Sequence, residues 1–400
     1  MYTDYLQNLS TEELIQKFDA YCKSPENLNR KKYWIENDDN LFPIERWRGR
    51  AAQKTNTVCT MSMDISGYSP LLGINCGKYY KDPENNLREQ LRYTLWDTEN
   101  IALGRYFEPT VFCSLASVFE AALYGQKVHF PEEQAPWFDE SDHLIKEKSD
   151  LLKLKPFDFE TSGLIPVCRE MYEHHKEAVK GTDLKPVFPF LVRSPFSTAI
   201  MLRGFEELLI DSIEDPEFFT ELMTYITDTE IEFTKKRAEY LGEPVYYPGM
   251  LGNDEIATPI VSPTMYNELI YPHEKRLAEF WGGIRYWHSC GKTDPFYEKI
   301  ATLDKLEMMH IGPWSDIPSA VEVFGPKDIS IEICMNSNRD LFDKDYDQMV
   351  ADLERIKSIC EGKIRYQIRM DGIAIFKNQE FTMQKVKEWV KAANQVFPVQ

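Results

Sequence analysis

The clearest pattern in the sequence is an alternation of short β-rich runs with long amphipathic stretches, which begins near residue 184. The long stretches repeat apolar residues with helical periodicity, and glycine or proline stands at nearly every joint. Strands that alternate with crossover helices form parallel sheets. Six such units, with one or two more upstream, predict a (β/α)8 TIM barrel of the α/β class. The six predicted strands cover residues 185–192, 243–251, 283–289, 306–312, 328–334 and 364–370.

The first hundred residues follow a different and mostly helical pattern. Ser10 and Glu13 have the spacing of a capping box at the start of a helix over residues 10–23. Residues 82–100 predict a second helix with a proline near its start, and residues 57–65 alternate enough to form a strand. We therefore predict a helical N-terminal extension at residues 1–100, packed on a barrel catalytic domain at residues 101–400, as one structural unit.

Composition is that of an ordinary globular protein, with 43% hydrophobic and 28% charged residues among 400. The formal net charge of −19 argues against nucleic acid or an anionic membrane as the main partner. The sequence begins with no secretory signal and contains no apolar run long enough to span a bilayer. We expect a cytoplasmic protein whose 8 scattered cysteines are reduced.

In a barrel of this kind the chemistry lies at the C-terminal ends of the strands. The sharpest feature there is the segment 287–291, Trp-His-Ser-Cys-Gly. His288 and Cys290 straddle the predicted strand end, so both can point at one cation, and imidazole nitrogen with thiolate sulfur suits Zn²⁺. In the alternative interpretation, His288 bonds a backbone carbonyl in a turn and Cys290 packs inward.

A zinc site needs at least one more protein ligand. Cys334, at the end of another predicted strand, is one candidate, although a lone cysteine is often only a small buried apolar residue. Asp254 and Glu255 follow the strand at 243–251 and could bind metal, act as catalytic acid or base, or cap the next helix. Asp371 is a similar candidate, with an Asp-Gly turn as its alternative.

Candidates for substrate contacts at the same rim are Trp287, His310 and Asn336. For His310 a purely structural role is the alternative. The sequence has no GxGxxG, P-loop or GxSxG motif, so it gives no support to a dinucleotide-binding, P-loop or α/β-hydrolase function.

Three segments of the second half resemble the uroporphyrinogen decarboxylase-like superfamily. Residues 286–303, YWHSCGKTDPFYEKIATL, are similar to its H-x-C-G-N-T-D-P segment. Residues 252–277 and 194–223 resemble its D-D…I-S-P segment and its paired-helix segment. The decarboxylase branch uses no metal and carries an R-Q-A-G-R-Y-L-P signature. Residues 45–52 have arginines without that pattern, which weakens the decarboxylase interpretation. In the cobalamin-dependent methyltransferase branch, the zinc ligands include the His and Cys that match His288 and Cys290.

The resemblance has one departure. Thiol-methylating members take a third zinc ligand from a cysteine near the end of the last strand, and residues 364–372 contain none. Cys334 or a carboxylate (Asp371, Asp254 or Glu255) replaces it, or the site is incomplete. A less sulfur-rich ligand set suits zinc acting as a Lewis acid on an ether oxygen.

The resemblance thus implies an O-demethylase methyltransferase I. Such an enzyme moves a methyl group from a small methylated substrate, an aryl methyl ether, to cobalamin on a corrinoid protein. The sequence lacks a D-x-H-x-x-G cobalamin motif, so that corrinoid protein is expected to be a separate partner.

Two other functions stay open. A metal-free decarboxylase would use arginines such as Arg48 and Arg50 near the cavity. A tetrapyrrole- or corrinoid-binding protein without catalysis would bind the pigment and leave the metal site vacant. The sequence also leaves a homodimer open.

Overall fold

Parallel strands form the centre of the protein. The computed structural model describes residues 5–34, 50–55, 57–113, 115, 118–139, 141–245 and 249–398. A 6-stranded parallel sheet has the order β1-β10-β9-β8-β7-β6, and β2 pairs with β5 in parallel beside it. The strands are β1 Cys59–Met63, β2 Thr110–Phe112, β3 Val128–His129, β4 Trp137–Phe138, β5 Lys185–Val187, β6 Gly249–Gly252, β7 Ile284–His288, β8 Met308–Ile311, β9 Ser330–Asn336 and β10 Tyr366–Ile373.

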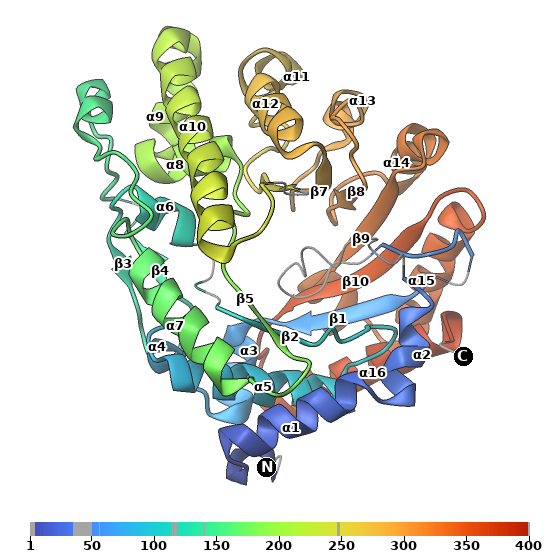
Figure 1. The fold of residues 1–400 in the computed structure, drawn as a ribbon. Helices are drawn as coiled ribbons and strands as arrows, with labels where there is room; N and C mark the ends of the chain where they lie inside the picture. Colours follow the sequence, from blue (N-terminus) through green and yellow to red (C-terminus); the bar gives the residue numbers. More distant parts are fainter. Residues whose placement is uncertain are drawn as a thin grey trace.

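These two sheets are parts of one barrel wall (Figure 1). A parallel bridge between Arg193 and Gly252 joins the chain after β5 to β6, and β10 pairs with β1 at the other edge. In the described part of the chain no strand ladder joins β1 to β2, so the hydrogen-bonded wall is open at that seam. The predicted (β/α)8 barrel is confirmed, and each of the six predicted strands overlaps a strand of the wall.

Helices surround this wall (Figure 1). They are α1 Thr11–Cys22, α2 Pro25–Lys31, α3 Ile65–Leu72, α4 Cys76–Tyr79, α5 Pro83–Asn100, α6 Phe119–Leu123, α7 Ile165–Ala178, α8 Pro195–Arg203, α9 Phe205–Glu214, α10 Pro216–Leu241, α11 Pro263–Met265, α12 Tyr271–Trp281, α13 Tyr297–Ile300, α14 Ile317–Phe324, α15 Tyr346–Cys360 and α16 Gln379–Val396. Among the helices of the described ranges, none combines the length and the apolar character that crossing a bilayer requires.

The N-terminal region behaves as its local signals predict. Helix α1 begins with a capping box between Ser10 and Glu13, and α5 begins at Pro83. The expected division of the chain at residue 100 stays a prediction. Strand β1 shows that the first hundred residues also supply a strand of the barrel sheet.

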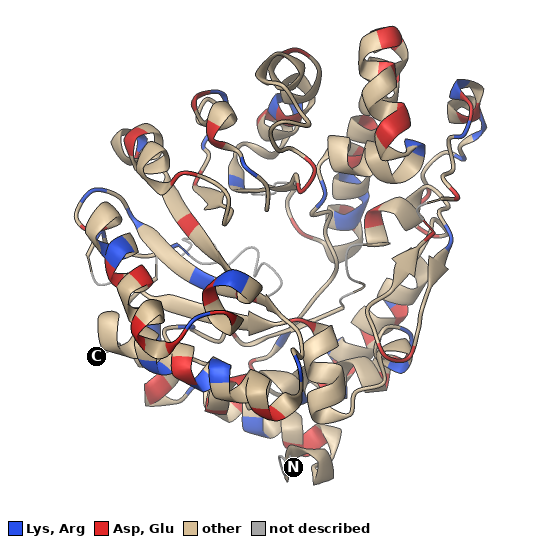
Figure 2. Cartoon of the chain, turned by 180° about the vertical axis from the view of Figure 1, so that it is seen from behind, with Lys and Arg blue, Asp and Glu red and all other residues tan. Residues whose placement is uncertain are grey.

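Burial on both faces explains the composition of the central strands. Every residue of β7 and β8 is buried, as is nearly every residue of β9. Parallel strands covered by helices outside and by side chains inside are expected to be buried in this way. Charged residues stand mainly on the helices and loops and are sparse on the strands (Figure 2). A charged residue inside a strand, such as Glu332 in β9 or Arg369 in β10, is therefore unusual here.

Glu274 anchors α12 to the segment that carries the candidate site. Its carboxylate accepts hydrogen bonds from Asn253 Nδ2 and from the Tyr266 hydroxyl, both at 2.6 Å, and from Trp287 Nε1 at 3.2 Å. Burial raises the pKa of Glu274 to about 7, because the loss of hydration outweighs the three donors. Glu274 thereby holds the residues that precede Asp254 and His288 in the chain.

Stability should fall as the pH rises from about 4.5 to about 7, because folded Glu274 retains a proton that the unfolded chain releases in this range. Glu274→Gln should flatten this part of the profile. It should also lower the free energy of unfolding by about 1–3 kcal/mol, since an amide offers one acceptor to three donors. Urea denaturation at several pH values measures both effects. Glu268→Gln, an exposed position in the preceding turn, is the control; an identical change in both variants contradicts the prediction.

Candidate metal centre

Three side chains from two neighbouring strands converge at the mouth of the barrel. His288 ends β7, Cys290 follows in the next loop, and His310 lies in β8. One ligand atom of each lies within 4.8 Å of the others, and His288 Nε2 is 3.4 Å from Cys290 Sγ. Two ligands of one tetrahedral zinc, with bonds of about 2.0–2.1 Å to nitrogen and about 2.3 Å to sulfur, are roughly 3.5 Å apart. The pair therefore has the spacing of two ligands that share one cation.

Strand register brings the two histidines together. Tyr286 pairs with Met308 and Trp287 with Met309, so His288 comes beside His310 on the same face of the sheet. Their ring centroids are 4.1 Å apart. The loop after β8 packs closely on Cys290, since a Cβ at Gly312 would lie 2.9 Å from its carbonyl oxygen. Because Gly312 has no side chain, the loop that carries Cys290 can pack directly against the end of β8.

Asp254 borders the same cluster from the loop after β6. Its Oδ1 lies 2.9 Å from His288 Nε2, and its Oδ2 accepts a 2.7 Å hydrogen bond from Arg193. Burial alone would raise the pKa of Asp254, but His288 and Arg193 outweigh it and hold this pKa well below its usual value. Burial and the nearby Asp254 carboxylate raise the pKa of the Cys290 thiol to about 12. A bound divalent cation reverses this situation, because it stabilises the thiolate.

His310 is buried behind the other two side chains. Its Nδ1 lies 2.9 Å from the Tyr286 hydroxyl and 3.4 Å from Glu332 Oε1. Its Nε2 is buried and has no hydrogen-bond partner in the described part of the chain. Burial and the neighbouring His288 lower the pKa of His310 to about 3, so the ring is neutral. A neutral imidazole with a free nitrogen is the form that binds a metal.

The charges around the cluster favour a cation. Acidic side chains outnumber the basic ones. Each basic side chain forms an ion pair with an acidic one: Arg193 with Asp254, and Arg369 with Asp371 at 2.8 Å. The acidic side chains are Asp254, Glu255, Glu332 and Asp371, and the basic ones are Arg193 and Arg369. Excess negative charge in a buried site is unfavourable unless a cation balances it. With the unpartnered His310 nitrogen, this donor set fits a divalent metal such as zinc.

Glu255 lies beside this cluster. It accepts a hydrogen bond from the Ser197 hydroxyl and is 3.7 Å from Arg193. Burial raises the pKa of Glu255 in spite of Arg193, which makes it the carboxyl group here with the greater tendency to hold a proton. The sequence-predicted pair thus divides into an ionised Asp254 and a more readily protonated Glu255.

Two of the residues expected to contact the substrate make other contacts in the structure. Trp287 is fully buried, and its indole N–H donates to Glu274 on α12, so the ring faces the helices and not the barrel mouth. Asn336 accepts from the backbone N–H of Arg339 at 2.9 Å and caps the helical turn Ser337–Phe342. His310, the third expected contact, is part of the metal-ligand cluster.

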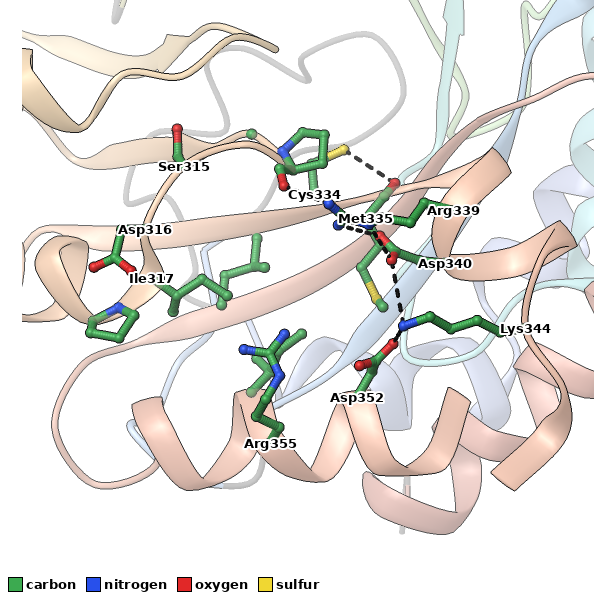
Figure 3. A pocket seen from close by; sticks show the side chains of 15 residues that line it. Ser315, Asp316, Ile317, Cys334, Met335, Arg339, Asp340, Lys344, Asp352 and Arg355 are labelled. Carbon is green, nitrogen blue, oxygen red and sulfur yellow. Dashed lines mark hydrogen bonds and ion pairs between the residues drawn. The ribbon is translucent and has the colours of Figure 1, made fainter. Parts of the chain in front are cut away.

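Cys334 lies on the same face of β9 as Glu332, with Cys290 among its electrostatic neighbours, and it also borders a cavity of about 220 Å³ between β9 and the helices α14 and α15 (Figure 3). Its thiol is directed to the Met335 carbonyl oxygen at 3.9 Å, and burial raises its pKa far above the usual value. Among the described residues, the cluster at the mouth consists of His288, Cys290 and His310 and does not include Cys334. A ligand role for Cys334 or Asp371 therefore stays a prediction.

The functional neighbours that sequence reasoning missed are Glu332 and Arg369. A glutamate in the apolar run Ser-Ile-Glu-Ile-Cys and an arginine in Tyr-Gln-Ile-Arg-Met were the available signals. A charged residue at the centre of a buried strand needs a partner inside the barrel. Glu332 and Arg369 are such partners, with Arg369 Nη2 3.4 Å from Glu332 Oε1.

Arg50 does not lie at the mouth. Its Nε is 3.3 Å from Glu307, which precedes β8 at the N-terminal end of the barrel. Arg48 lies outside the described residues. The arginine-based carboxylate site of a decarboxylase therefore gains no support from Arg50.

Comparisons with known proteins identify the family of the chain and two similar proteins. Residues 110–338 match the family model described as "Uroporphyrinogen decarboxylase (URO-D)". A methylated-thiol–coenzyme M methyltransferase of Methanosarcina mazei is 24% identical over 161 residues, which is 40% of this chain and 42% of that protein. The match thus spans less than half of that relative. The solved structure of a methyltransferase from Methanosarcina mazei superposes with a TM-score of 0.60 at 16% identity, over 85% of this chain and 92% of that one, and shares the fold.

Cys290 should be the fast-reacting thiol of the metal-free protein. All 8 cysteines lie in the described residues, and Cys290 is exposed while the others are buried. Thiol labelling under native conditions should therefore modify Cys290 before the buried cysteines, although its raised pKa slows the reaction of this thiol as well. Cys290→Ser should abolish the fast phase, and Cys334→Ser should retain it. A fast phase that survives in Cys290→Ser would mean that another thiol is accessible.

Proposed function

Because the chain belongs to the uroporphyrinogen decarboxylase family, we propose that it is a methyltransferase of that family rather than a decarboxylase. It takes a methyl group from a small methylated substrate, an aryl methyl ether, and passes it to cobalamin on a separate corrinoid protein. The observation that carries the proposal is the His288–Cys290 pair, 3.4 Å apart at the barrel mouth. The name of the methyltransferase relative supports the same reaction class.

His288 and Cys290 would hold a zinc ion in this proposal. Bound zinc supplies Lewis acidity at the substrate oxygen that carries the methyl group. Asp254, fixed by Arg193, keeps a negative charge beside the two ligands. This charge helps to retain a cation at the mouth.

Glu255 would act as the acid. Burial raises its pKa, so it holds a proton more readily than an ordinary glutamate does, and the Ser197 hydroxyl fixes one of its oxygens. As the methyl group departs, the Glu255 proton passes to the oxygen left on the substrate, and the carboxylate then pairs with Arg193. An acid is needed because an alkoxide or phenolate is a poor leaving group unless its charge is stabilised.

Exposed apolar side chains around the mouth support a protein partner. Ile260, Trp314 and Phe376 stand on the loops after β6, β8 and β10 and are 47%, 58% and 37% exposed. The Arg339 guanidinium lies over the Trp314 ring at 5.4 Å. Aromatic and arginine side chains of this kind are enriched at protein interfaces. The free state of all 8 cysteines fits the expected cytoplasmic location.

The purified protein should bind about one zinc per chain, measured by elemental analysis after dialysis. Cys290→Ser should lose the metal and lower methyl transfer by about 100-fold or more, because its thiolate is a direct ligand. The fold should persist, since Cys290 lies in an exposed loop. Cys22→Ser, on α1, is the matched control. Full activity without bound metal would contradict the proposal.

With a reduced corrinoid protein and methoxylated phenols, the absorption spectrum should change from that of Co(I) to that of methyl-Co(III). Trp314→Glu should slow this transfer at low corrinoid protein concentration, since it places a charge in the proposed docking surface. Ile213→Glu, at an exposed position on α9, is the control. If only methylated thiols donate a methyl group, the ether substrate is wrong, but the assignment as a methyltransferase stands. Failure with ethers, thiols and amines, together with decarboxylation of a tetrapyrrole, would favour the decarboxylase.

A further inference from the structure

We infer that His310 is the third protein ligand of this metal centre, and that Tyr286 and Glu332 fix its ring with Nε2 directed at the cation. The inference rests on the proposed function and deepens it. It replaces the cysteine or carboxylate that the sequence offered as third ligand with a second imidazole. It also assigns positioning roles to two residues inside the barrel.

The position of His310 supports this role first. The β7–β8 register sets it beside His288, and one of its nitrogens lies within 4.8 Å of ligand atoms of both His288 and Cys290. The residue is 0% exposed, so water does not reach its ring freely. Buried polar atoms nearly always have a partner, and His310 Nε2 has none among the described residues. A cation between the three side chains would supply it.

Hydrogen bonding selects the correct tautomer. The Tyr286 hydroxyl donates its proton to Glu332 Oε1, so its oxygen is available as an acceptor. His310 Nδ1 lies 2.9 Å from that oxygen and 3.4 Å from the Glu332 carboxylate. Both neighbours therefore require a proton on Nδ1, which leaves the lone pair on Nε2. Histidine ligands of metals commonly donate their other N–H to a carboxylate or a similar acceptor in this way.

The residues behind Glu332 keep this arrangement rigid. Arg369 Nη2 lies 3.4 Å from Glu332 Oε1, and Gln367 Nε2 donates to Oε2 at 3.4 Å. The Tyr286 hydroxyl also lies 3.3 Å from His288 Nδ1. One hydroxyl group thus contacts the outer nitrogens of both imidazoles.

Among the described residues, the other candidates for third ligand are not part of the cluster of donor atoms. Cys334 Sγ is directed to the Met335 carbonyl oxygen, and Asp371 pairs with Arg369 and Ser62. Asp254 is adjacent, with Arg193 on its second oxygen and its first oxygen 2.9 Å from His288 Nε2. Two imidazoles and one thiolate leave a fourth tetrahedral position open, as catalytic zinc sites require.

Zinc affinity, measured by competition with a chromogenic chelator, tests the inference together with the absorption spectrum of the Co²⁺-substituted protein. Tyr286→Phe should weaken zinc binding by about 10–100-fold, the usual effect of losing an outer partner. His310→Gln should weaken it by more than about 100-fold, as loss of a ligand exceeds loss of its partner. In His310→Gln the Co²⁺ spectrum should change while the thiolate-to-metal band of Cys290 is retained. Cys334→Ser should match the parent protein in both measurements.

The outcomes separate this inference from the proposed function. If the parent protein binds neither zinc nor cobalt, the proposed function itself fails. If Cys290→Ser loses the metal but His310→Gln and Tyr286→Phe keep the parent affinity and spectrum, only the third-ligand assignment fails. Loss of metal in Cys334→Ser with a folded chain would also overturn it. Circular dichroism checks folding, and Tyr286→Phe, which keeps the ring, provides the test if His310→Gln does not fold.

Discussion

The parallel register between β7 and β8 is the constraint on which the candidate site depends. It sets His288 and His310 side by side on the inner face, with ring centroids 4.1 Å apart, and the following loop returns Cys290 to within 3.4 Å of His288. A shift of one residue in either strand would turn one imidazole to the outer face. The sheet therefore places the two imidazoles, and only the thiol depends on a loop.

The inside of the barrel carries charge that needs compensation. Glu332 and Arg369 stand within strands, and each is almost fully buried. Their contact compensates the two charges, and it also places a carboxylate behind His310 and Tyr286. Asp254 and Arg193 form a similar pair on the other side of His288. Two ion pairs thus support the donor atoms from opposite sides, and the remaining negative charge favours a cation between them.

Local signals in the sequence predicted most of the fold. Capping residues, strand composition and glycine or proline at the joints gave α1, α5 and the six late strands. The resemblance and the strand-end rule pointed to His288, Cys290 and Asp254, because each stands at or just after a strand end. The direction of a side chain was harder to predict. Trp287 and His288 are adjacent, yet Trp287 packs under α12 and His288 faces the barrel interior, and this depends on the pleat and not on residue type. The same alternation decides the environment of His310, Cys334 and Glu332.

A centre with two imidazoles and one thiolate would differ in chemistry from one with two thiolates. Each thiolate donates charge to zinc and lowers its Lewis acidity, while neutral imidazole leaves the metal more electrophilic. An electrophilic metal suits an ether, whose oxygen must accept charge as the methyl group departs. A sulfur-rich site suits the activation of a thiol. With a neutral His310 in the third position, and with Glu255 able to hold a proton nearby, the proposed site is better matched to a methyl–oxygen bond than to a methyl–sulfur bond.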